Sequence, residues 1–86
     1  MKISLNIPDY EGKGIHLEWD DYFILRAMIN SKRNIVTISG NNEGLISLAR
    51  HLLTLAQSNV PIGKHIHFDS LNSLEEGSCG IVIEKI

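Results

Sequence analysis

The segment GNNEGLISLARHLLTLAQS, residues 40–58, constrains the fold more strongly than any other part of this chain. Its apolar residues recur at intervals of three and four, which places them on one face of an α-helix. Asn41 or Asn42 can cap the start of this helix, and Pro61 lies just beyond its end. We therefore predict one long amphipathic helix whose leucine stripe is the main element of the core. Its polar back carries Ser47, Arg50, His51, Thr54 and Gln57.

Five shorter segments have the alternation or the β-branched composition of strands. They are KISLNI (2–7), GIHLEW (14–19), NIVTIS (34–39), HIHFD (65–69) and CGIVIEK (79–85). The first two are close enough in sequence to form a hairpin, and the last two to form another with a long loop. Residues 20–31 fit either a short helix that starts at Asp20 or a further strand, and we predict the helix.

These elements predict an α+β fold in a single domain, residues 1–86. We expect two layers: a mostly antiparallel sheet with one long and one short helix on one face, in the order ββαβαββ. The order becomes ββββαββ if residues 21–30 are extended. The sheet face that turns away from the helices would be polar and weakly acidic, and it would carry His16, Glu18, His65, His67 and Asp69.

The charges are unevenly distributed although the formal net charge is only −2. Residues 65–84 contain Asp69, Glu75, Glu76 and Glu84 and no lysine or arginine. Proteins that bind DNA or RNA instead cluster their basic residues. We therefore expect no nucleic-acid partner, and we favour a basic protein partner.

The apolar runs, the N-terminal residues and the cysteine count indicate the compartment of the protein and whether it associates with a membrane. No apolar run approaches the about 18 residues that a membrane span requires, and the N-terminal residues lack the layout of a signal peptide. Cys79 is the single cysteine, so an internal disulfide is excluded. These features predict a cytoplasmic protein that has no membrane partner and fits a reducing compartment.

Two chemical interpretations of the stretch from His65 to Asp69 compete with partner binding. His65, His67 and Asp69 alternate along a predicted strand, and His16 is a possible fourth ligand, so a small metal-binding protein or enzyme is the alternative function. A nucleophilic role for Cys79 is weaker, because a small thiol at the start of an apolar strand is ordinarily buried. No phosphate-binding, dinucleotide or metalloprotease motif is present. We predict no catalytic activity, no cofactor and no metal.

Three segments together resemble a known family. The segments are VTISGNNEGLISLARHLLTLAQ, PIGKHIHFD and NSLEEGSCGIVIEK. Through the order and spacing of these segments, residues 34–86 resemble the immunity protein 32 family of bacterial polymorphic toxin systems. The resemblance implies an α+β protein, encoded beside a secreted toxin, that binds and neutralises the toxin in the cytosol of the producing cell. It implies motif positions at His65, His67, Asp69, Asn72, Leu74, Glu75, Glu76, Gly77 and Ser78, and structural positions at Gly44 and the helix leucines.

We therefore predict a toxin-binding surface formed by one sheet face and the loop that follows residue 69. The partner is expected to be a cognate toxin domain, and pairing of two copies through an exposed edge strand is a further possibility. The residues predicted to bind the partner are His65, His67, Asp69, Asn72, Glu75, Glu76, His16 and Glu18.

Overall fold

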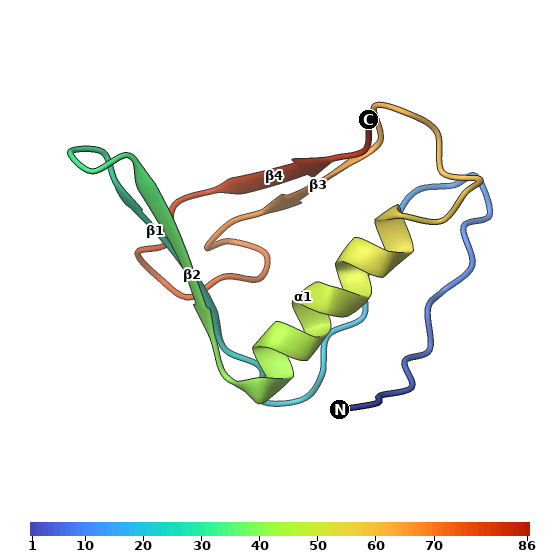
Figure 1. The fold of residues 1–86 in the computed structure, drawn as a ribbon, viewed down its shortest axis with the longest axis horizontal. Helices are drawn as coiled ribbons and strands as arrows, with labels where there is room; N and C mark the ends of the chain where they lie inside the picture. The colour runs from blue at the N-terminus through green and yellow to red at the C-terminus, as the bar shows by residue number, and fades with distance from the viewer.

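The structure is a computed structural model that describes residues 1–86 and contains one helix and four strands. The elements are β1 (Leu25–Asn30), β2 (Ile35–Gly40), α1 (Asn42–Leu55), β3 (His65–Phe68) and β4 (Ile81–Glu84). β1 pairs with β2 and β3 pairs with β4, both antiparallel, in two separate two-stranded sheets. Figure 1 shows the two hairpins diverging, with α1 running beneath them. The predicted α+β class is confirmed.

α1 begins where the sequence predicts, but it ends at Leu55, before the end of the predicted segment 40–58. The Asn41 side chain caps its start, where Oδ1 accepts the N–H of Gly44 at 2.8 Å. Glu43 lies in the first turn, near the positive end of the helix dipole. At the other end the N–H of Ala56 donates to the carbonyls of Leu52 and Leu53.

Segment 20–31 forms a strand rather than the predicted short helix. Leu25 and Ala27 are fully buried while Arg26 between them is exposed, which is the period of two that a strand requires. A turn precedes the strand, with the N–H of Phe23 donating to the carbonyl of Asp20. The prediction of a helix was therefore wrong, and the extended alternative is correct for residues 25–30.

Residues 2–7 and 14–19 do not form the two predicted strands. Residues 8–20 instead run along the polar side of α1, and side chains of the helix take the place of a neighbouring strand. The Gln57 amide donates to the Pro8 carbonyl at 2.9 Å, and Gln57 Oε1 accepts the Tyr10 N–H at 3.2 Å. Ser47 Oγ accepts the N–H of Asp20 at 2.9 Å. These bonds satisfy backbone groups that a sheet would otherwise pair.

The predicted orientation of α1 was consequently wrong on its polar side. Ser47, His51 and Thr54 are the buried polar residues of the protein, whereas Leu45 and Leu52 of the leucine stripe are 48% and 41% exposed. The polar side faces residues 8–20 because it supplies their hydrogen-bond partners. Of the predicted stripe, Leu55 is in the core and Leu48 packs against it.

The core lies where α1, β1 and β3 meet. Phe68 is 1% exposed, and its ring meets the Trp19 ring edge-on with centroids 5.8 Å apart. Trp19 also stacks on Phe23, at 4.4 Å. Burying each large apolar side chain contributes about 1.5–3 kcal/mol. The buried apolar residues are Leu25, Ala27, Leu55, Val60, Ile66, Phe68 and Leu74.

A candidate partner-binding face on β3 and the loop after it

β3 presents two histidines on the side that faces away from the core. His65 and His67 are exposed, while Ile66 and Phe68 between and after them are buried. The two imidazole rings meet edge-on with their centroids 4.9 Å apart. The register places Glu84 opposite His65 and Val82 opposite His67, so these residues share the outer face of the β3–β4 pair.

Asp69 and Asn72 hold the loop that follows β3. The Asp69 carboxylate accepts the N–H groups of Leu71 at 2.9 Å and Asn72 at 3.1 Å. The Asn72 amide donates to the His67 carbonyl at 3.0 Å, and its oxygen accepts the Asp69 N–H at 3.1 Å. Such bonds between a side chain and nearby backbone are typical of turns built on Asp and Asn. These two residues therefore fix the shape of the loop.

The second half of the loop is fastened to β1. The N–H of Glu75 donates to the Leu25 carbonyl and that of Cys79 to the Ala27 carbonyl, both at 2.9 Å. Ser78 Oγ accepts the N–H of Ala27 at 3.2 Å. Gly77 has a φ of +85°, a left-handed conformation that glycine adopts without steric cost, and it turns the loop toward β4. The loop is thus a fixed part of the fold, with Glu75 half-buried and Glu76 exposed.

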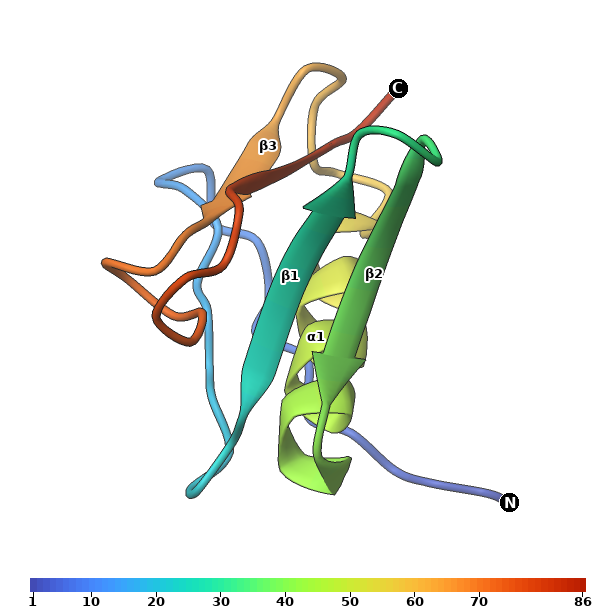
Figure 2. The same ribbon diagram turned by 90° about the vertical axis from the view of Figure 1, so that its left-hand side faces the viewer.

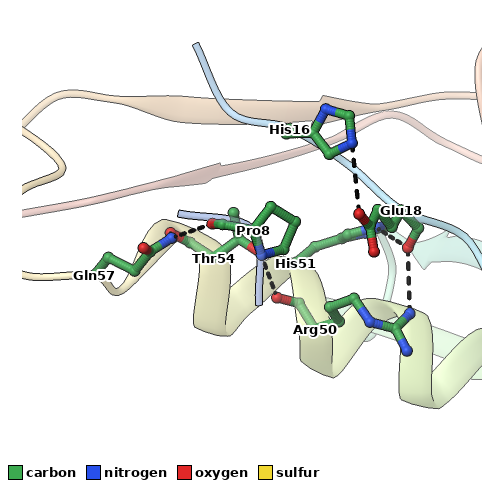
Figure 3. A network of polar contacts seen from close by, with 7 residues as sticks. All are labelled: Pro8, His16, Glu18, Arg50, His51, Thr54 and Gln57. Carbon is green, nitrogen blue, oxygen red and sulfur yellow. Dashed lines mark hydrogen bonds and ion pairs between the residues drawn. The ribbon is translucent and has the colours of Figure 1, made fainter. Parts of the chain in front are cut away.

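His16 and Glu18 lie on a different part of the surface. They form an exposed pair, with His16 Nε2 3.6 Å from Glu18 Oε1 (Figure 3). Both line a shallow hollow of about 470 Å³ that residues 8–18 surround. No hydrogen bond, ion pair or ring contact joins them to the β3 histidines. Six of the eight predicted residues therefore lie on β3 and the loop after it, and these two lie in a separate acidic region.

The arrangement offers little to a metal ion. Nowhere does the chain gather three or more His, Cys, Asp or Glu side chains at ligand spacing. The Asp69 carboxylate already accepts two backbone N–H groups, and no hydrogen bond or ion pair links it to His65 or His67. Because zinc sites use three or four protein ligands, the β3 histidines alone do not form one.

His51 is a buried residue that sequence reasoning placed on the surface. It is fully buried, and its ring lies edge-on to Trp19 at 4.2 Å. Its Nε2 donates to the Glu18 carbonyl at 2.9 Å, and Arg50 donates to the same oxygen (Figure 3). His51 Nδ1 has no partner. Burial lowers the pKa of His51, and the nearby Arg50 cation lowers it further.

Comparison with known proteins identifies the family. The immunity protein 32 model matches residues 35–86, more than half of the chain. This chain belongs to the immunity protein 32 family. The matched residues agree with the predicted resemblance, and they include β2, α1, β3, the loop after it and β4. Neither a search of curated proteins nor a search of solved structures gave a match. The structure has no helix with the length and apolar character needed to cross a bilayer.

Proposed function

We propose that this immunity protein neutralises a cognate protein toxin by binding it directly in the cytoplasm of the cell that produces both. Membership of the family supports an immunity role. The observation that carries the proposal is the outer face of β3, where two exposed histidines adjoin an acidic loop that is fixed to the fold. Masking a toxin requires affinity rather than chemistry, so we propose no catalytic role for any residue.

The residues of this face divide into two groups by their contacts. His65, His67 and Glu76 are exposed and available to a partner, and Glu75, the neighbour of Glu76 in the loop, is half-buried. Asp69 and Asn72 support them by holding the loop, so their contribution is to its shape. We include His16 and Glu18, which lie in the separate acidic region, as a second contact with the toxin.

The charge of the face fits a basic partner. No lysine or arginine occurs between residues 65 and 84, so nothing within that segment offsets its carboxylates. Charge complementarity of this kind raises association rates and fixes orientation more than it increases final affinity. A standard interface requires about 800 Å² from each partner. The face and its loop are the region from which we expect that area to come.

The test is a charge reversal in the loop. We expect Glu75→Lys combined with Glu76→Lys to slow association with the toxin domain about tenfold or more at low salt, and the difference to shrink as salt is added. Surface plasmon resonance measures the rates, and survival of toxin-expressing cells measures protection. Circular dichroism checks that the variant is folded.

The matched control is Asp21→Lys combined with Glu43→Lys. It changes the net charge equally at exposed positions outside the face. We expect the control to retain nearly the native association rate. If both double variants bind at the native rate and protect cells fully at low expression, the loop is not the contact surface. If both are slowed equally, the effect comes from overall charge.

A further inference from the structure

The outer edge of β2 has no partner in the chain. β1 points the backbone groups of Leu25 and Ala27 away from β2, because those groups bond to the loop at Glu75, Ser78 and Cys79. In an antiparallel pair, two residues that lie opposite each other both turn their backbone groups inward or both turn them outward. Ile38 lies opposite Ala27, and Val36 is two residues before Ile38, so the N–H and C=O groups of Ile38 and Val36 lie on the free edge of β2. Only β1 pairs with β2.

This edge lacks the features that ordinarily keep edge strands apart. β2 reads IVTISG and contains no charged residue and no proline. Val36 is 56% and Ile38 40% exposed, and Ile29 of β1, on the same face of the hairpin, is 63% exposed. The hairpin therefore presents an apolar face beside a row of unpaired backbone groups.

The molecule also has more surface than a compact protein of its mass. It exposes 6273 Å², whereas a compact monomer of 9.6 kDa exposes about 5,100 Å². Its radius of gyration is 13.6 Å, against about 12 Å for a compact chain of this length. All of residues 28–39 are exposed. The excess of about 1,200 Å² is larger than the about 800 Å² that each partner contributes to a stable interface.

We propose that two copies of this chain pair through β2, antiparallel, about a twofold axis at Thr37. In this register Val36 of one copy lies opposite Ile38 of the other, and each such pair exchanges both backbone hydrogen bonds. The apolar side chains of both copies then share one face of a continuous four-stranded sheet. On the other face the two Thr37 side chains lie side by side, a favourable cross-strand pair.

Charge and geometry favour a second copy as the occupant of this edge. An uncharged edge brings no like charges together when it pairs with itself, although each chain is acidic overall. The antiparallel arrangement also brings the turn with Lys32 and Arg33 of one copy toward Glu43 of the other, at the start of α1. In Figure 2 β2 lies on the right and β3 at the upper left, with β1 between them, so pairing through the outer edge of β2 leaves the β3 face free for a toxin.

The first measurements use the full chain alone, without toxin, so their outcome is independent of the proposed function. We expect light scattering after size exclusion to give twice the 9.6 kDa monomer mass, with dissociation on dilution. In amide exchange followed by NMR, the N–H groups of Val36 and Ile38 become protected as concentration rises. The N–H of Thr37 is protected throughout, because it bonds to β1.

Two variants of Val36 disrupt the pairing and one of Met28 is the control. Val36→Pro removes an outward N–H from each copy but no bond to β1, so we expect the dimer Kd to rise on the order of 10- to 100-fold. Val36→Lys places a charge on the paired edge and is expected to give monomer, even if the proline variant fails to fold. Met28→Lys adds the same charge on the opposite face of β1 and should leave the dimer intact.

Three results would overturn the proposal. The first is a monomeric mass up to millimolar concentration, and the second is a dimer that Val36→Lys does not weaken. The third is protection of the Val36 and Ile38 amides that appears only when the toxin domain is added. That last result would assign the β2 edge to the toxin.

Discussion

A substitution at Gly44 is the most direct test of how closely α1 approaches the backbone of Ile24, just before β1. Gly44 is buried in the first turn of the helix, and its Cα lies against the backbone of Ile24. A Cβ built there would fall well inside van der Waals contact of the Ile24 carbonyl oxygen and carbon. Both are backbone atoms, so no side chain can rotate away to make room. We predict that Gly44→Ala destabilises the protein.

The magnitude follows from two opposed effects. Alanine stabilises a helix interior by about 1 kcal/mol relative to glycine. Overpacking typically costs about 1–3 kcal/mol, and a clash with fixed backbone belongs at or above the top of that range. The Asn41 side chain holds the strand in place, with Oδ1 accepting the Ile24 N–H at 2.9 Å and Nδ2 donating to the Tyr22 carbonyl at 2.9 Å. We therefore expect a net loss of about 2 kcal/mol or more.

Urea denaturation followed by circular dichroism measures this loss. The free energy of unfolding of a domain this size is only about 4–13 kcal/mol, so a loss of about 2 kcal/mol shifts the midpoint clearly. Ala49→Gly, at an exposed position of the same helix, is the control that reports helix propensity alone. It should lose about 1 kcal/mol. A Gly44→Ala variant as stable as the native protein, or more stable, would refute the close approach of α1 to Ile24.

Two further predictions concern polar contacts of a buried residue, His51, and a half-buried one, Lys85. Because burial lowers the pKa of His51 below its ordinary 6.5, the unfolded chain takes up a proton that the folded chain does not. Stability should therefore fall as the pH drops below 6.5, by up to about 1.4 kcal/mol per unit until the folded-state pKa is reached. In urea titrations at several pH values His51→Gln, which retains a donor for the Glu18 carbonyl, should reduce this slope; an unchanged slope would contradict the assignment. Lys85 Nζ donates to the carbonyls of Gln57 at 2.6 Å and Val60 at 2.7 Å, so Lys85→Met should lower the melting temperature through a loss of about 2 kcal/mol. An unchanged melting temperature would show that these bonds contribute nothing.

The sequence predicted those elements whose signals are local. The leucine spacing and the cap at Asn41 located α1, and β-branched composition located β2. In β3 the alternation predicted that His65 and His67 point outward, as they do. What local pattern could not supply was the partner of each segment. Residues 2–7 and 14–19 alternate like strands, but the structure gives them no neighbouring strand to pair with.

The same limit explains the errors at the helix and in the candidate site. Periodicity places Ser47 and His51 on one side of α1, but it does not say whether that side meets water or the backbone of another segment. Likewise, Asp69 and Asn72 are polar residues in a loop, and polarity alone does not separate a residue that contacts a partner from one that bonds its own turn. Both distinctions depend on contacts between parts of the chain that are distant in sequence or on exact loop geometry.

The boundary of the family match at residue 35 does not coincide with a folding unit. β2 pairs only with β1, which precedes the match, and Leu25 of β1 is in the core. The matched helix holds the preceding chain in part through its backbone: His51 bonds the Glu18 carbonyl, Gln57 the Pro8 carbonyl and Ser47 the Asp20 N–H. Almost any residue offers such backbone atoms. These backbone bonds place little demand on the side chains at Pro8 and Glu18, whereas Trp19 and Leu25 also pack through their side chains. The proposed β3 face and its loop lie within the matched region.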